Sequence, residues 1–244
     1  RFWEVNGPYL LGSIVHHMIL DPRDSKTILM AAQTKTHGPM IFKSVDFGMN
    51  WVPVISPPKF STHKKVAHIY RLTPGHESEP NVWYAGTSPQ GLFKSEDFGD
   101  TWQEVSGFNN HPQIDKWCGT PAASTLKYEK IHSIMVHPQN ARSIIIGMAS
   151  GGVFESMDGG ESWISMNEGL TSSDIKDSLG RDPHLVVLHP MDPSRIYQQN
   201  QGGIFRLDVG RRIWKHIGAG IDRGDIGFSL CVHPQDPDTL WVFP

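Results

Sequence analysis

The stretch that decides the fold is SEDFGDTW at residues 95–102. The same pattern occurs as SVDFGMNW at residues 44–51 and as SMDGGESW at residues 156–163. A fourth copy, DVGRRIW at residues 208–214, lacks the serine and carries one extra residue before the tryptophan. The four aspartates lie 51, 61 and 50 residues apart. This spacing is typical of propeller blades and similar repeat arrays.

Each copy lies between two short runs of apolar and β-branched residues, which predicts a strand, a tight turn and a second strand. The glycine supplies a conformation that side chains with a Cβ resist, and the serine and aspartate can accept backbone N–H groups of the turn. The tryptophan is expected to pack on the apolar layer of the blade. We therefore expect a structural role for Ser44, Asp46, Gly48, Trp51, Ser95, Asp97, Gly99, Trp102, Ser156, Asp158, Gly160, Trp163, Asp208, Gly210 and Trp214.

A second repeated element lies about 25 residues before each of these turns. It is an apolar strand that ends in a residue followed by proline, and the prolines concerned are Pro22, Pro74, Pro138, Pro190 and Pro234. A further β-rich run follows each of them. The repeating unit is thus strand A, X-Pro turn, strand B, loop, strand C, Asp turn and strand D. Four antiparallel strands per unit of about 50 residues predict an all-β fold, a β-propeller.

The repeat frame divides the chain into four complete blades with part-blades at both ends. Residues 1–12 are expected to form the last strand of a preceding blade, and residues 226–244 the first strands of a further one. We expect the chain to be an open arc of a six- or seven-bladed ring, whose partners would be the missing blades of its own protein. The four blades are placed at residues 13–56, 66–106, 130–167 and 182–218.

Composition excludes several functional classes. The chain of 244 residues has 22 Lys+Arg against 25 Asp+Glu, a net charge of −3, so no basic surface for nucleic acid or for a membrane is expected. Two cysteines form neither a disulfide framework nor a zinc pattern, and we expect no metal or other cofactor. We expect a soluble chain, with a cytoplasmic location favoured over secretion and neither established by the sequence.

The Asp turns resemble the BNR/Asp-box repeat of sialidases, sortilin-type receptors and xyloglucan-acting glycosidases. The wider sequence is most similar to bacterial BNR-like repeat proteins described as glycosyl hydrolase-like. This similarity is carried by residues 16–24, 83–93, 151–156 and 197–204. Such proteins are usually longer, so the resemblance implies a fragment of a propeller. It does not carry over a catalytic set, because a sialidase arginine triad is not identifiable. The string YRLTP at residues 70–74 fills an ordinary strand A turn.

Alignment of the blades isolates a recurring histidine. Five residues before the X of each X-Pro turn stand His16, His68, His132 and His184, and then Phe228. The first strand of a blade lines the central channel. We therefore expect these histidines near the channel mouth, on the face that carries the D–A and B–C loops.

Those loops are also where length and polar residues concentrate, which suits a polar ligand such as a sugar. The first hypothesis is a propeller that binds such a ligand, carbohydrate or protein. Channel histidines that are merely solvated remain an alternative, as does a histidine-bound metal. Another alternative is a glycoside hydrolase with a carboxylate pair drawn from Asp182, Glu129, Asp222 and Asp225, although these also fit solvated loop charges. The candidate ligand-binding residues are His16, His68, His132, His184, Gln33, Gln90, Trp117, Asp182, Gln199 and Asn200.

Overall fold

The computed structural model describes residue 5 and residues 7–117, 129–170, 182–221 and 224–243. Within them, the strands form four antiparallel sheets of four strands and one sheet of two strands. The strands of the first two sheets are β1 (Ile14–Leu20), β2 (Ile28–Thr34), β3 (Gly38–Ser44), β4 (Val52–Pro53), β5 (His68–Pro74), β6 (Trp83–Ser88), β7 (Gly91–Ser95) and β8 (Gln103–Glu104).

The later sheets repeat this order. They consist of β9 (Ile131–His137), β10 (Asn140–Met148), β11 (Gly152–Ser156), β12 (Ile164–Ser165), β13 (Pro183–Leu188), β14 (Arg195–Asn200), β15 (Gly203–Asp208), β16 (Ile213–His216), β17 (Ser229–Val232) and β18 (Leu240–Phe243). Two short helices, α1 (Ser106–Asn109) and α2 (Ile114–Trp117), follow β8. Neither of these helices is long enough to cross a membrane.

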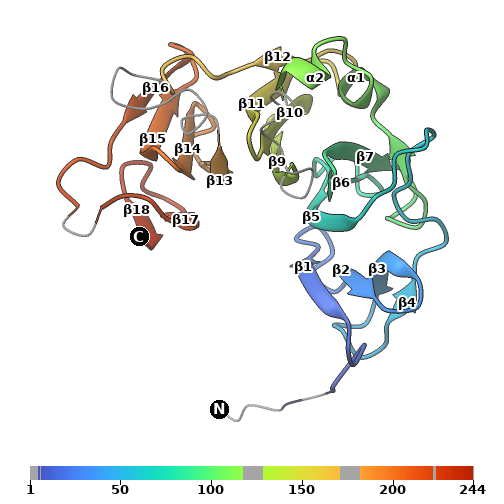
Figure 1. The fold of residues 1–244 in the computed structure, drawn as a ribbon. Helices are drawn as coiled ribbons and strands as arrows, with labels where there is room; N and C mark the ends of the chain where they lie inside the picture. The colour runs from blue at the N-terminus through green and yellow to red at the C-terminus, as the bar shows by residue number, and fades with distance from the viewer. Residues whose placement is uncertain (1–4, 6, 118–128, 171–181, 222–223, 244) are drawn as a thin grey trace.

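The sheets stand side by side in an open arc (Figure 1). The first strand of each sheet, β1, β5, β9, β13 and β17, lies on the inside of the arc, and the last strands lie on its outside. The two chain ends lie at the open side. The predicted all-β propeller, with four complete blades and a fifth partial one, is therefore confirmed. Part of the strand expected within residues 1–12 lies outside the described residues, and the described residues 7–12 form no strand.

The apolar core is shared between neighbouring blades. One cluster joins Leu29 and Ile41 of the first blade to Leu72 and Phe93 of the second. Two further clusters join the second blade to the third and the third to the fourth. Because both faces of a blade are covered by its neighbours, central strands such as β6 are buried along their whole length. Burial of these shared layers fixes the position of each blade against the next.

The Asp turns fold through their own side chains. In the second blade, Ser95 Oγ donates to Asp97 Oδ1 at 2.8 Å and accepts from Gly99 N at 2.9 Å. Asp97 also accepts from Thr101 N and Thr101 Oγ1, at 2.9 and 2.6 Å. Gly99 has φ +85°, a region that favours glycine. Trp102 closes the turn by donating from Nε1 to Gly99 O at 2.9 Å.

The fourth turn is built differently, as its sequence suggests. Trp214 is buried and donates to Met166 O, not to a carbonyl of its own turn. The carboxylate of Asp208 pairs with Arg206 at 3.1 Å, while its main-chain oxygen accepts from Arg211 N at 2.8 Å. The lost serine thus changes which atoms hold the turn, while the strand pair β15–β16 is retained.

Candidate functional site

The first strand of every complete blade carries a β-bulge at the same level. In β1 the extra residue, which has no partner on the second strand, is His16; in β9 it is His132 and in β13 it is His184. In β5 it is Tyr70. Bulges redirect a side chain and are common next to functional sites. The structure therefore offers four redirected ring-bearing residues on the inside of the arc.

The register corrects the histidine alignment in the second blade. A backbone hydrogen bond closes the A–B turn, and its donor is the N–H of Asp21, His189 or His233 in the first, fourth and fifth blades. In the second blade the corresponding bond runs from Gly75 N to Val82 O at 2.9 Å. Pro74 is the last residue of β5, not part of that turn. Since β5 pairs on one side only, proline is tolerated there. The residue equivalent to His16 is thus Tyr70, and the prediction that His68 occupies this position is wrong.

The equivalent positions are thus His16, Tyr70, His132, His184 and Phe228, which we call the inner rim. Neighbouring members touch at the first and the last of the four junctions between blades. The His16 and Tyr70 ring centroids are 4.9 Å apart, and the His184 ring stacks on Phe228 at 4.3 Å. His68 still reaches the rim, because its Nδ1 and His16 Nε2 share a hydrogen bond of 3.1 Å. The structure brings three of the four predicted histidines to equivalent places and the fourth, His68, into contact with His16.

The rim is flanked by fixed positive charge and contains uncharged histidines. Burial, and then the positive charge of Lys130, lowers the pKa of His132 to about 3. Burial also lowers the pKa of His16, helped by His68 and Lys130. Lys130 Nζ lies 4.7 Å from the centre of the Tyr70 ring. At neutral pH His16 and His132 are therefore neutral, and each can donate one hydrogen bond and accept another.

Two side-chain oxygens close to this level, Gln33 Oε1 and Gln199 Oε1, are buried and lack partners among the described residues. Gln199 is fully buried, and its Nε2 donates to Asp225 O at 3.2 Å. Asn200 is also fully buried and accepts from Gly202 N at 2.7 Å. Gln90 lies in the B–C turn of the second blade, where its main-chain oxygen accepts from Lys64 Nζ at 2.7 Å. An unpaired buried polar atom costs free energy.

Two predicted residues are used elsewhere. Trp117 packs on the core of the third blade, with its ring 4.4 Å from Phe154 and stacked on His111 at 4.1 Å. Asp182 Oδ1 accepts from Ser150 N at 2.9 Å and so ties the third blade to the fourth. Neither of these contacts involves a residue of the inner rim.

Asp182 and Asp225, two of the carboxylates considered for an acid/base pair, are held by separate partners. Asp225 Oδ2 lies 2.5 Å from His216 Nε2, and Glu129 is buried. Asp222 lies outside the described residues. No hydrogen bond or ion pair between described residues joins Asp182 to Asp225. The described part of the chain also contains no group of three or more His, Cys, Asp or Glu side chains that could hold a metal ion.

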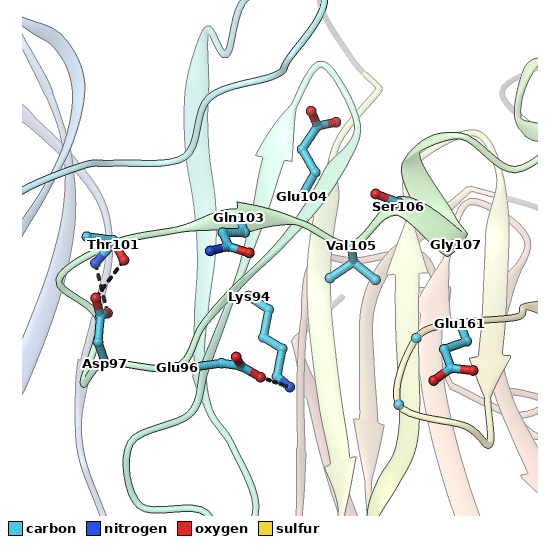
Figure 2. Close-up of a pocket in the computed structure, with 12 residues that line it drawn as sticks. Lys94, Glu96, Asp97, Thr101, Gln103, Glu104, Val105, Ser106, Gly107 and Glu161 are labelled. Atoms are coloured by element: carbon cyan, nitrogen blue, oxygen red, sulfur yellow. Dashed lines mark hydrogen bonds and ion pairs between the residues drawn. The ribbon is translucent and has the colours of Figure 1, made fainter.

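A pocket of about 460 Å³ lies between the second and third blades, beside the Asp turns (Figure 2). Its carboxylates have structural partners. Asp97 accepts from Thr101, Glu96 pairs with Lys94 at 2.6 Å, and Glu104 accepts from Ser61 N at 2.6 Å. Figure 2 shows Asp97 and Glu161 at opposite ends of the group, and the Glu96 carboxylate paired with Lys94 between them. We do not assign a catalytic role to it.

Comparison with known proteins fits this geometry. The family model described as BNR-Asp box repeat matches residues 92–105, which run from β7 through the second Asp turn to the end of β8. The chain is an Asp-box β-propeller. Strand order, turn chemistry and the repeat match all support this statement.

Curated relatives of this propeller include xyloglucanases. One from Paenibacillus sp. is 23% identical over 98% of this chain and 24% of its own length. The xyloglucanase Xgh74A of Acetivibrio thermocellus is 25% identical over 93% of this chain and 29% of its own length. The Asp-box propeller therefore spans only about a quarter of the length of these relatives.

Among solved structures, the GH74 xyloglucanase from Xanthomonas campestris superposes with a TM-score of 0.66. It is 18% identical, and the match covers 93% of this chain and 34% of that one. At this identity the likeness shows the fold alone.

Proposed function

We propose that this Asp-box propeller binds a polysaccharide along the inner rim, on the face that carries the D–A and B–C loops. The observation that carries the proposal is the bulge shared by all four complete blades, which places His16, Tyr70, His132 and His184 at one level. A chain of sugar units needs a row of ring faces and of groups that donate and accept hydrogen bonds. Histidine and tyrosine side chains supply both.

The rim is matched to a neutral polar ligand. Burial keeps His16 and His132 uncharged at neutral pH, so their rings can donate and accept hydrogen bonds with hydroxyl groups. The relatives described as xyloglucanases support carbohydrate as the ligand class and suggest xyloglucan as the first probe. Protein as the ligand, left open by the sequence, lacks comparable support.

The test is calorimetric titration of the intact protein with xyloglucan oligosaccharides. Replacing both His16 and His184 with alanine should weaken binding about thirtyfold, since each loses a hydrogen bond and a ring contact worth together roughly 1 kcal/mol. His76→Ala is the matched control, because His76 lies in the A–B turn of the second blade, where its Nε2 bonds to Pro138 O at 3.0 Å. Equal affinities for both variants, or no binding by wild type, would overturn the proposal.

A second candidate is a glycoside hydrolase, favoured by the xyloglucanase relatives over nearly the whole chain. Asp182 and Asp225 are held by separate partners, Ser150 and His216, so a direct measurement of activity decides this candidate. Incubation of the intact protein with xyloglucan, followed by detection of new reducing ends, tests it. If activity is present, Asp182→Asn and Asp225→Asn in turn should each be examined. Unchanged rates in both would exclude them as the catalytic pair.

A further inference from the structure

A second concave site lies in the connection between the first and second blades. Residues 54–67 leave β4 and return to β5 without forming a strand of their own. This segment is nonetheless anchored, since Ser56 N donates to Asp100 O at 3.0 Å and Ala67 N donates to Ser88 O at 2.8 Å. Phe60 is buried and contacts Phe93 with ring centroids 5.1 Å apart. The connection is therefore a fixed part of the D–A loop face.

A pocket of about 570 Å³ opens along this connection, within the size range of ligand pockets. Three lysines and two histidines line it, and none of its lining residues is acidic. By contrast, the pocket beside the Asp turns has four acidic lining residues and one lysine. The lysines are Lys59, Lys64 and Lys65, and the histidines are His37 and His63.

The positive charge of this pocket is local. The chain as a whole carries a net charge of −3, so its overall field does not attract anions. Lys64 is held in place, with its Nζ 4.5 Å from the centre of the Phe60 ring and donating to Gln90 O. Lys59, Lys65 and His63 are exposed at the rim of the pocket. A cluster of cations without lining carboxylates favours an anionic ligand.

The walls of the pocket are apolar. Pro39, Pro57, Pro58, Val66 and the ring of Phe60 contribute to them, together with Ile55. Such apolar walls offer no favourable contact to a small inorganic anion. A sugar ring that carries a carboxylate has an apolar C–H face for the prolines and a charge for the lysines. Carboxylate and apolar ring in one unit are the features of a hexuronic acid.

We propose that the pocket formed by residues 37–39 and 55–66 binds the hexuronic acid unit of an acidic polysaccharide. This rests on the proposed carbohydrate function of the same face and names a class of ligand for it. The uronate carboxylate lies among Lys59, Lys64 and Lys65, and the sugar ring lies against the proline walls. The site is separate from the inner rim and selects for charge, whereas the rim selects for neutral hydroxyl groups.

The test is titration of the intact protein with trigalacturonate and with its methyl ester. Lys59→Gln together with Lys65→Gln should weaken trigalacturonate binding about fivefold to tenfold, and wild-type affinity should fall as salt is raised. The ester should bind more weakly than the acid. Lys26→Gln with Lys215→Gln, two exposed lysines outside the pocket, is the matched control and should leave the affinity unchanged.

Three outcomes would overturn the proposal: no binding of trigalacturonate, equal binding by both double variants, or equal competition by inorganic sulfate. The last would show a general anion site. The two proposals fail separately. Xyloglucan binding that depends on His16 and His184, with no uronate binding, leaves the rim proposal standing. If the protein binds uronate in the lysine pocket but does not bind xyloglucan, only the proposal for the inner rim is contradicted.

Discussion

At the scale of single residues, the Asp turns depend on a carboxylate that stays charged. Hydrogen bonds from the side chain and the backbone of Asn50 lower the pKa of Asp46 to about 2. For Asp97, burial acts against the charge, but hydrogen bonds from Thr101 and Ser95 outweigh it and lower the pKa. The folded pKa lies below the unfolded value, so this stabilisation is present above about pH 4 and is lost as the pH falls further.

We predict that Asp97→Ala lowers the free energy of unfolding by about 2 kcal/mol, because hydrogen bonds to a charged acceptor are worth roughly 1.5–3 kcal/mol. Asp208→Ala is the control, since that carboxylate pairs with Arg206 and does not cap its turn through a serine. We expect a change of at most about 0.5 kcal/mol there. Urea unfolding of both variants measures the difference. Equal losses would show that the carboxylate is not what holds the second turn.

At the scale of strands, the repeated turns and the apolar runs beside them were sufficient to predict the sheets and their strand order. The bulges could not be predicted. A bulge exists only as a mismatch between two paired strands, and one strand's sequence does not show which of its residues lacks a partner. Pro74 also misled the alignment of the second blade, because a strand that pairs on one side only tolerates proline at its end. Tyr70 was therefore not recognised as the rim residue of the second blade. Gly75, which follows Pro74 and closes the A–B turn, was the sequence signal that could have located it.

Strands of neighbouring blades approach most closely through glycine. A Cβ on Gly86 of β6 would lie 2.6 Å from the main-chain oxygen of Ile131 in β9. In the fourth blade the large and small residues are exchanged. Gln199 stands at the position of Gly86 and faces Gly227, and a Cβ on Gly227 would lie 2.5 Å from Gln199 Nε2. Small and large residues are thus paired across each of these interfaces, which keeps the packing dense.

This pairing predicts that Gly86→Ala destabilises the protein by about 2 kcal/mol, since backbone atoms must move to admit the methyl group. Gly210→Ala is the control, because no heavy atom lies within 4 Å of the position its Cβ would take. Thermal unfolding followed by circular dichroism compares the two. If Gly86→Ala melts with the wild type, the interface between the second and third blades is looser than the contact implies.

At the scale of the whole molecule, side chains of one blade complete the backbone hydrogen bonds of the next. His17 Nδ1 accepts from Leu72 N at 3.3 Å across the first interface, and Ser133 Oγ accepts from Val186 N at 3.0 Å across the third. His17 and Ser133 each follow directly after a bulged histidine. The bulge therefore serves both to redirect a ring and to join blades.

The link across the first interface uses the ring of His17, so the stability of the arc depends on pH. Burial, and then the charge of Arg71, lowers the pKa of His17 to about 4. In the unfolded chain the value is near 6.5, so acidification protonates the unfolded state first, and stability falls as the pH drops from about 6.5 toward 4. At pH 5 this loss is about 2 kcal/mol for His17, at about 1.4 kcal/mol per pH unit. The window lies above that of the Asp turns.

We predict that His17→Asn removes this loss. Asparagine places an acceptor oxygen close to the position of Nδ1 and does not titrate, so the free energy of unfolding should fall by about 2 kcal/mol less between pH 7 and pH 5 than in wild type. Urea unfolding at the two pH values measures the slope. The control is His63→Asn, which exchanges an exposed histidine and should keep the wild-type slope. Identical slopes for wild type and His17→Asn would place the pH sensitivity in the buried His132 instead, because its pKa is lowered in the same direction.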